Sequence, residues 1–377
     1  MEYVIELKKV DKEFKVLNRH EGLKGSFQDL FSRDYKIIKA VNNVSMNIKP
    51  GEIVGYLGPN GAGKSTTIKM MTGVLQPTRG EILVNGKVPY KNRTANAQNI
   101  GVVFGQRSQL WWSLPLIESF KLLKDIYNIS DKDYKDMLTL YESLVDIKDL
   151  YSKPVRQMSL GQRTLSDILA AFLHNPPIVF LDEPTIGLDV SMKAKIRNLI
   201  KALNKEKNTT VILTTHDMGD VDALCERIVI IDKGTMLYDN DIEHLRSFFG
   251  AYRTLLIKTK KHPEELTDDE KKAELDNVEA IVKEAYADKD FTFSSTDEGW
   301  CSILIDESQV RLMKVLNHIQ EKIKVYDVRL EEISTESVIR KIYEDAENMK
   351  KANYYTSSVF LRKPPSPQGE GRVVKAK

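Results

Sequence analysis

The feature of this sequence that most constrains its fold is a glycine-rich stretch between an apolar run and a segment with helical periodicity. The run at 53–57 is typical of a buried strand, and Ile68, Met71 and Leu75 mark one face of a helix. The stretch between them matches the pattern G-x-x-x-x-G-K-[ST]. It consists of Gly58, Pro59, Asn60, Gly61, Ala62, Gly63, Lys64, Ser65 and Thr66. A strand, this loop and a helix in that order predict an α/β fold.

This loop pattern binds phosphate for physical reasons. Glycines let backbone N–H groups close around phosphate oxygens, and the N-terminus of the following helix adds partial positive charge. We expect the Lys64 ammonium to reach the β and γ phosphates of a nucleotide and the Ser65 hydroxyl to coordinate Mg²⁺. The loop therefore predicts a P-loop NTPase, a class that also contains kinases, GTPases and helicases.

A second apolar run, at 178–181, ends in two acidic residues. Acids at a strand end are often merely solvated, but a carboxylate here is also the usual partner of the Mg²⁺ that a phosphate loop binds. Asp182 is expected to hold the metal, directly or through water. Glu183, one residue further on, is expected to polarise the attacking water as a general base.

The segment 158–163 narrows the class. It precedes a helix with an apolar face and comes shortly before the acidic strand, and in these residues the chain resembles the ABC ATPase family. The resemblance implies a signature loop whose residues meet the γ-phosphate of ATP bound to the opposite subunit: Ser159, Leu160, Gly161 and Gln162. Leu160 departs from the family pattern, which has a glycine at that position, and this departure affects the expected geometry of the loop.

Other elements of the same family follow in the expected order. The resemblance implies that Gln106 senses Mg²⁺ as a further metal ligand and couples the site to a transmembrane partner. It also implies that Asp189 lies at the dimer interface and that His216 contacts the γ-phosphate as a catalytic residue. A lone histidine after a strand is more often structural, but this one completes a set of motifs.

The family stacks the adenine base on an aromatic ring upstream of the phosphate loop. The spacing favours Tyr35, and Phe14 is the alternative, because the insert at 18–34 divides the region where the ring is expected. Leu23, Phe27 and Leu30 in that insert have helical spacing, consistent with a short amphipathic helix. Packing on its own domain is the simplest interpretation of that helix.

The pattern of glycines and apolar runs also predicts the domain organisation. Residues 1–245 should form the ATPase domain around a mainly parallel sheet, with a helical insert at about 113–170. Residues 246–345 should form a small α+β accessory domain, with strands near 254–257, 301–305 and 325–328 and helices at 263–286, at 309–323 and from 335. The segment 346–377 has too little apolar surface to fold and is predicted to be a disordered tail.

Composition restricts the partners. The 56 Lys and Arg residues nearly balance the 54 Asp and Glu residues, so no global charge favours nucleic acid or anionic lipid. No apolar run approaches the length of a membrane-spanning helix. If the chain serves a membrane, another chain must therefore span it. The family resemblance implies partners of two kinds, membrane permease subunits on separate chains and a second ATPase subunit, identical or related, with no nucleic acid expected. It also implies that the protein is cytoplasmic and peripheral on the inner face of the cell membrane.

The motifs and the ending at 329–343 look most like the NatA-like and daunorubicin-exporter branch, which favours export. Trp111 and Trp112 follow Gln106 where a permease would dock, although local packing is an equal alternative. The main rival is an ABC-class ATPase that acts on ribosomes or DNA; a single phosphate loop, without sustained heptads or a cysteine cluster, argues against it. An importer ATPase is a weaker alternative.

Overall fold

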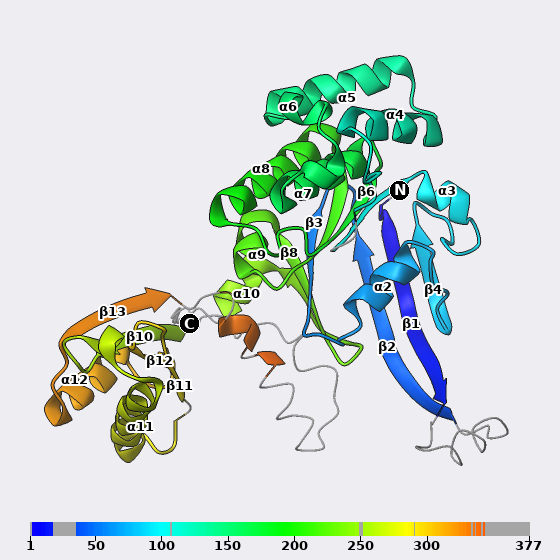
Figure 1. Cartoon of the computed structure of the whole chain (residues 1–377). Coiled ribbons are helices and arrows are strands. Elements are labelled where there is room, and N and C mark those ends of the chain that lie inside the picture. The colour runs from blue at the N-terminus through cyan, green and yellow to red at the C-terminus, as the bar shows by residue number, and fades with distance from the viewer. Residues whose placement is uncertain are drawn as a thin grey trace, which may run out of the picture. The chain divides into compact units, whose positions relative to one another are not determined.

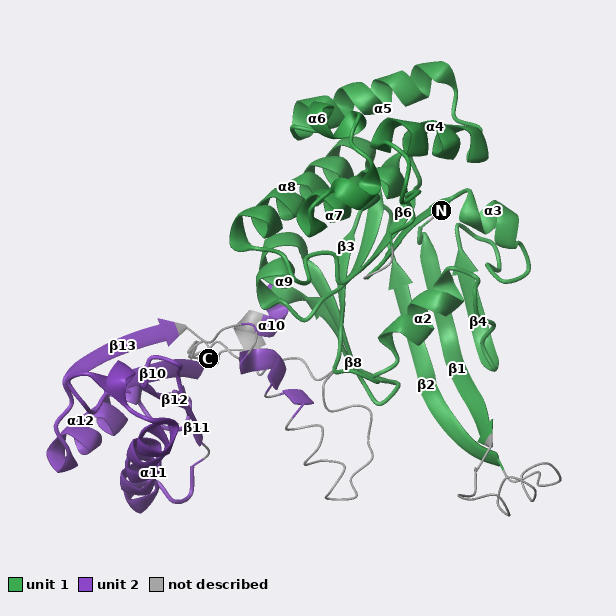
Figure 2. Cartoon of the chain, in the orientation of Figure 1, with its two compact units in different colours: residues 1–242 green, residues 243–377 purple. Residues whose placement is uncertain are grey.

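The computed structural model divides the chain into two compact units, residues 1–242 and 243–377 (Figure 2). It describes residues 2–17, 35–105, 108–248, 252–289, 291–332, 335, 337–340 and 342–343. The first unit ends slightly before the expected boundary at residue 245. The helix expected in the insert 18–34 and the tail expected at 346–377 lie outside the described residues.

A six-stranded sheet forms the centre of the first unit, in the order β5-β6-β7-β3-β8-β9 (Figure 1). Its strands are β3 (Ile53–Leu57), β5 (Ile100–Phe104), β6 (Ile178–Asp182), β7 (Thr210–Thr214), β8 (Arg227–Asp232) and β9 (Thr235–Asp241). Neighbouring strands are parallel except β8 and β9. All residues of β3 and β7 are buried, as the continuous apolar runs indicated. The predicted α/β fold is confirmed.

A second sheet, with antiparallel strands, packs on the same core. It contains β1 (Ile5–Leu17), β2 (Tyr35–Ile48) and β4 (Arg79–Val84) in the order β2-β1-β4. Buried side chains of this sheet, of α2 (Lys64–Met71) and of the central sheet form one apolar cluster, which includes Leu7, Ile48, Ile82, Ile68, Met71, Val54 and Phe180. The phosphate loop therefore begins from a strand held on both faces.

The segment expected to be a helical insert contains α4 (Leu116–Ile126), α5 (Asp131–Leu144), α6 (Lys148–Tyr151) and α7 (Leu160–Phe172), with a 3₁₀ turn at Val155–Gln157 (Figure 1). The other helices of this part of the chain are α3 (Arg93–Ala97), α8 (Val190–Lys207), α9 (Met218–Leu224) and α10 (Ile242–Phe248). Among the described residues, no helix combines the length and the apolar character needed to cross a bilayer.

The second unit has the element order β-α-β-β-α-β. Strands β10 (Tyr252–Lys258), β11 (Phe291–Ser295), β12 (Cys301–Asp306) and β13 (Asp327–Glu332) form an antiparallel sheet in the order β11-β12-β10-β13. Helices α11 (Asp268–Ala285) and α12 (Leu312–Lys322) bury apolar side chains against it. This is the split βαβ, ferredoxin-like arrangement. The sequence did not indicate β11, whose first four residues are only half-buried and give no clear alternation.

The packing of the helical segment can be tested by removing a buried hydrogen bond between α5 and α7. The Tyr141 hydroxyl donates to the Leu169 carbonyl oxygen at 2.7 Å, and Tyr141 is fully buried. Tyr141→Phe should lower the free energy of unfolding of the first unit by about 1 kcal/mol, measured by denaturant titration, because the carbonyl loses this partner. Tyr134→Phe is the control, because the buried Tyr134 hydroxyl has no hydrogen-bond partner. Equal losses in both variants would contradict this account.

Candidate active site

The functional residues converge at one edge of the central sheet. Strands β3, β5, β6 and β7 are parallel, so the segments that follow them meet at the same edge. A cavity of about 380 Å³ lies there. Its lining combines the phosphate loop, the acidic pair and two residues that the sequence did not indicate, Ala40 and Gly105: Ala40, Pro59, Asn60, Gly61, Gly63, Lys64, Ser65, Thr66, Gly105, Asp182 and Glu183.

The loop conformation requires glycine. Gly63 has φ +105°, and a Cβ on it would lie 2.3 Å from the carbonyl oxygen of Ala40. Gly61 has φ +82° but open space around it, so there the backbone conformation alone favours glycine. Gly63 also precedes the first turn of α2, which receives no side-chain cap. The uncapped turn leaves backbone N–H groups and partial positive charge for an anion.

Lys64 is the first residue of α2 and is 7% exposed. Its ammonium donates to the carbonyl oxygens of Gly58, at 2.5 Å, and Pro59, at 3.2 Å. Burial lowers the pKa of Lys64, while the charges of Glu183 and Asp182 act in the opposite direction. The loop itself thus holds a cation beside the acidic pair, where a polyphosphate can bind both the ammonium and the loop amides.

The acidic pair is fixed by the neighbouring strand β7. The Thr214 hydroxyl donates to Asp182 Oδ1, and the Gly105 amide donates to the Asp182 carbonyl oxygen at 3.0 Å. The Glu183 amide donates to the Thr214 carbonyl oxygen at 2.9 Å. Glu183 has φ +52°, a left-handed conformation that costs about 1–2 kcal/mol for a non-glycine residue. Strain of this kind occurs where the surrounding structure holds a functional residue in place.

His216 is the direct partner of Glu183. Its Nε2 lies 2.8 Å from Glu183 Oε1, although the two residues come from different inter-element segments. Neither side chain is fully buried, with 46% of the histidine and 24% of the glutamate exposed. The structure thus brings together the histidine and the glutamate that the sequence identified separately, beside the phosphate-loop cavity.

The signature residues lie at the start of α7 and are not part of that cavity lining. Ser159 caps the helix: its hydroxyl accepts the Gln162 amide at 3.2 Å, and Gln162 Oε1 accepts the Ser159 amide at 3.2 Å. Gln162 also accepts from Lys153 at 2.9 Å. Leu160 is 49% exposed. A Cβ on Gly161 would lie 2.7 Å from Met192 Cγ on α8, so the two helices pack closely there and a larger residue would displace the Met192 side chain.

Asp189 has a structural role within its own chain. Its carboxylate caps α8 by accepting the Met192 amide at 2.9 Å. Nearby, a Cβ on Gly187 would lie 3.3 Å from a methyl group of Leu160, so the loop before α8 adjoins the signature loop. The expected interface role of Asp189 stays a prediction.

The segment after β5 is joined to the signature helix. Gln106 and Arg107 lie outside the described residues, but Ser108 Oγ and the Gln109 amide donate to Asp167 Oδ1 at 2.9 and 3.0 Å. Burial raises the pKa of Asp167 to about 6. This link was not apparent in the sequence, because it joins residues 58 and 59 positions apart through the way the two segments pack.

The two tryptophans remain accessible. Trp111 is 38% and Trp112 53% exposed, and the Arg163 guanidinium of α7 lies 4.7 Å from the centre of the Trp112 ring. Local packing therefore covers only part of the surface of each ring. Docking of a partner there stays a prediction.

Tyr35 on β2 and Phe14 on the paired strand β1 are the two candidate aromatics for the base, and they lie at different distances from Ala40. Tyr35 is five residues from Ala40, which lines the cavity, whereas Phe14 pairs with Ile38, two residues from Ala40. At about 3.3 Å per residue, these positions are about 16 Å and about 7 Å along the strand from Ala40. This placement favours Phe14, the alternative, over Tyr35.

Comparison with known proteins agrees with this site. Residues 41–186 match the sequence profile described as ABC transporter. The ABC transporter ATP-binding protein NatA of Bacillus subtilis (strain 168) is 33% identical over 215 residues, which cover 57% of this chain and 87% of that protein. The cholesterol transporter ABCA5 of Rattus norvegicus is 31% identical over 289 residues, 77% of this chain but 17% of that protein.

Solved structures of ABC ATP-binding proteins are also similar to this chain. The ATP-binding cassette MJ0796, dimeric in a post-hydrolysis state with ADP and phosphate, is 28% identical with a TM-score of 0.51, covering 63% of this chain and 98% of that one. An ATP-binding subunit of an ABC transporter is 25% identical with a TM-score of 0.54, covering 66% of this chain and 93% of that one.

The sheet, the phosphate loop and the acidic strand define a P-loop NTPase domain. The chain belongs to the ABC transporter family and is an ATP-binding, ATP-hydrolysing subunit of that family. Subunits of this kind dimerise and work with transmembrane components.

The position of the adenine ring can be tested with two alanine variants. Phe14→Ala should raise the dissociation constant for ATP about 10-fold or more, because stacking of a base on an aromatic ring contributes roughly 1–3 kcal/mol. Tyr35→Ala should change it by about twofold or less. Affinity for inorganic tripolyphosphate, which has no base, is the control and should be equal in both variants. A loss confined to Tyr35→Ala would establish the opposite assignment.

Proposed function

We propose that this chain drives an exporter. Two ATPase subunits, identical or related, close around two Mg-ATP molecules and move separately encoded permease subunits, with the ATPases peripheral on the cytoplasmic face of the cell membrane. The observation that carries the proposal is the distribution of the motif residues. The loop and acidic pair line one cavity, whereas Ser159, Gly161 and Asp189 are not among the residues that line it. A second subunit can supply those residues.

The names of two relatives support separate permeases. NatA is named as an ATP-binding protein, and this chain covers 87% of it. The CbiO1 protein of Clostridium perfringens, a fold relative, is described as part of the ABC transporter complex cbiONQ. The match to ABCA5 spans 289 residues, more than the 242 residues of the first unit, so it extends into the second. The resemblance of residues 329–343 to the extension of exporter ATPases favours export.

The residues at the cavity fit Mg²⁺ bound together with phosphate. Within the described residues, no group of three or more His, Cys, Asp or Glu could hold a metal ion. Ser65 and Asp182 both line the cavity, and Mg²⁺ in such sites binds one or two protein ligands, phosphate oxygens and water. When bound, Mg²⁺ neutralises charge on the β and γ phosphates. Ser65 and Asp182 would hold it, with Gln106 as a further ligand expected from the sequence.

The remaining residues have separable roles in hydrolysis. Lys64 and the loop amides bind the phosphates and stabilise the charge that develops on the leaving group. Glu183 orients the attacking water and accepts its proton. His216, at 2.8 Å from Glu183, holds that carboxylate in place and can contact the γ-phosphate. Ser159 and Gly161 of the second subunit bind the γ-phosphate from the other side.

The role of Glu183 can be tested by an isosteric change. Glu183→Gln should bind Mg-ATP with near-normal affinity but hydrolyse it about 100-fold or more slowly, because the amide cannot accept a proton. Mg-ATP should then hold a dimer that light scattering detects. Glu206→Gln, at an exposed position of α8, is the control and should hydrolyse normally. An undiminished rate in Glu183→Gln would remove Glu183 from the general-base role.

Sharing of the sites between subunits can be tested by complementation. Lys64→Ala removes the phosphate-binding cation, and Ser159→Asp places a carboxylate at the expected position of the γ-phosphate while keeping a good helix cap. Gly161→Asp is less suitable, because its Cβ would clash with Met192 in the same subunit. Each homodimer should be inactive, and a mixture should recover part of the hydrolysis rate, because one site in each mixed dimer is intact.

Ser159→Asn is the matched control for that experiment. Asparagine caps a helix as well as aspartate but has no charge, so this variant should keep more activity than Ser159→Asp. Absence of recovery in the Lys64→Ala and Ser159→Asp mixture, with both proteins folded and able to form mixed dimers, would contradict shared sites.

The permease partner can be tested by purification from membranes. We expect the tagged chain to be recovered from detergent extracts in a stoichiometric complex with a polytopic membrane protein. Trp112→Ala should weaken that complex while the isolated ATPase keeps its hydrolysis rate, because the ring is exposed and Trp112 is not among the residues that line the cavity. Recovery with ribosomes or DNA alone would contradict the transporter proposal and support the rival.

A further inference from the structure

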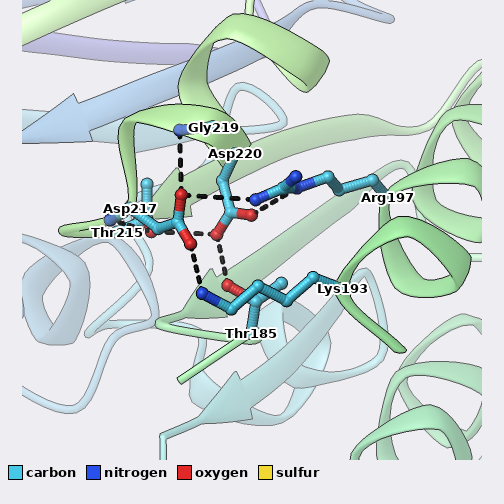
Figure 3. Close-up of polar contacts among 7 residues, drawn as sticks. All are labelled: Thr185, Lys193, Arg197, Thr215, Asp217, Gly219 and Asp220. Atoms are coloured by element: carbon cyan, nitrogen blue, oxygen red, sulfur yellow. Dashed lines mark hydrogen bonds and ion pairs between the residues drawn. The ribbon is translucent and has the colours of Figure 1, made fainter. Parts of the chain in front are cut away.

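Asp220 is a buried carboxylate that joins three segments of the first unit. It lies in the first turn of α9 and is fully buried. Its Oδ2 accepts the hydroxyls of Thr185 and Thr215, the second at 2.9 Å, and its Oδ1 accepts Arg197 Nε at 2.6 Å (Figure 3). These partners come from the loop after β6, the loop after β7 and helix α8.

Charge in this cluster is balanced. Asp217 accepts Lys193 Nζ and, at 3.3 Å, Arg197 Nη2, so two carboxylates face two cations (Figure 3). The Gly219 amide adds a hydrogen bond to Asp217 at 2.8 Å. Burial would raise the pKa of Asp217, but the hydrogen bond and charge of Lys193, together with Arg197, hold it below its ordinary value. Each carboxylate of the cluster thus has a cation and a hydrogen-bond donor beside it, which offsets the cost of removing its charge from water.

The two threonines lie next to the residues assigned to hydrolysis. Thr185 is two residues after Glu183, and Thr215 immediately precedes His216. Both hydroxyls bind the same oxygen of Asp220, so the distance between the two loops depends on that oxygen. Thr185 and Thr215 are 1% and 3% exposed, so solvent does not offer their hydroxyls an alternative partner.

The backbone near Glu183 needs such an anchor. Glu183 is in the left-handed region, which persists only when neighbouring contacts enforce it. The strand side supplies one contact, from the Glu183 amide to the Thr214 carbonyl oxygen. Asp220 supplies a further contact through Thr185, on the far side of Pro184.

We propose that Asp220 is a positioning residue that sets the distance between Glu183 and His216 by binding Thr185 and Thr215 through one carboxylate oxygen. Arg197 of α8 is its counter-charge. Asp220 contacts neither the glutamate nor the histidine; it acts through the two loops that carry them. The inference rests on the roles proposed above for Glu183 and His216.

Thr185→Val is the sharpest test, because it removes one hydroxyl, keeps the volume of the side chain and leaves Asp220 paired with Arg197 and Thr215. The rate at saturating ATP should fall about 10- to 100-fold, the loss expected for a displacement of about 1 Å in a catalytic group, with KM nearly unchanged. Thr185→Ser, which keeps the hydroxyl, should restore the rate. Asp220→Asn should also lower the rate at saturating ATP. If Asp220→Asn does not fold, Thr185→Val still tests the proposal.

Two measurements separate positioning from a purely structural role. In a crystal structure of Thr185→Val, the distance from Glu183 Oε1 to His216 Nε2 should exceed 3.5 Å, compared with 2.8 Å here. In a His216→Ala background, adding Thr185→Val should cause little further loss in single-turnover hydrolysis, because the pair is already broken. An unchanged distance, or the same fold-loss in both backgrounds, would overturn the proposal.

Failure of the inference about Asp220 can be distinguished from failure of the proposed function. If Glu183→Gln and His216→Ala hydrolyse ATP normally, the assigned roles fail, whatever Thr185→Val does. If those variants lose activity while Thr185→Val and Asp220→Asn keep the full rate, the inference about Asp220 alone fails.

Discussion

The parallel register of β5, β6 and β7 is the constraint on which the site depends. Phe104 pairs with Asp182, and Asp182 pairs with Thr214, so three strands end level with one another. This alignment places the Thr214 hydroxyl on Asp182 and the Gly105 amide on the Asp182 carbonyl oxygen. A slip of one residue in any of these pairings would turn the side chains to the opposite face of the sheet. The register of these strands therefore also fixes where Asp182, Thr214 and Gly105 lie relative to one another.

Polar contacts then refine what the sheet positions. Glu183 is held in a strained backbone conformation between strand β7 and the loop that contains Thr185. Asp220, which is fully buried, binds that loop through Thr185, and the two cations of its cluster compensate the two carboxylates. In a low-dielectric interior such a cluster is costly unless every member is paired, so it favours one arrangement of the loops over others.

The signature helix α7 contacts two other parts of its unit, α8 and the segment after β5. Its first turn adjoins α8 through Gly161 and Met192, and its middle is joined to the segment after β5 through Asp167. Both neighbours thus contact the helix that begins with the residues proposed to act on the second subunit's ATP. The second unit, a separate split βαβ fold, carries its own apolar core.

The sequence by itself determined the fold class, the phosphate loop, the acidic strand, the order of the motifs and most elements of the second unit. These features are local: each depends on residue type and short-range periodicity, which fix strand, loop and helix within a few residues. Tertiary structure decided the rest. The pairing of Glu183 with His216, the contact of Asp220 with Thr185 and Thr215, the capping role of Asp189 and the closeness of Phe14 to the cavity all join or place residues through the way separate elements pack. No local pattern encodes such contacts, because strand order and register are set by burial across the whole unit.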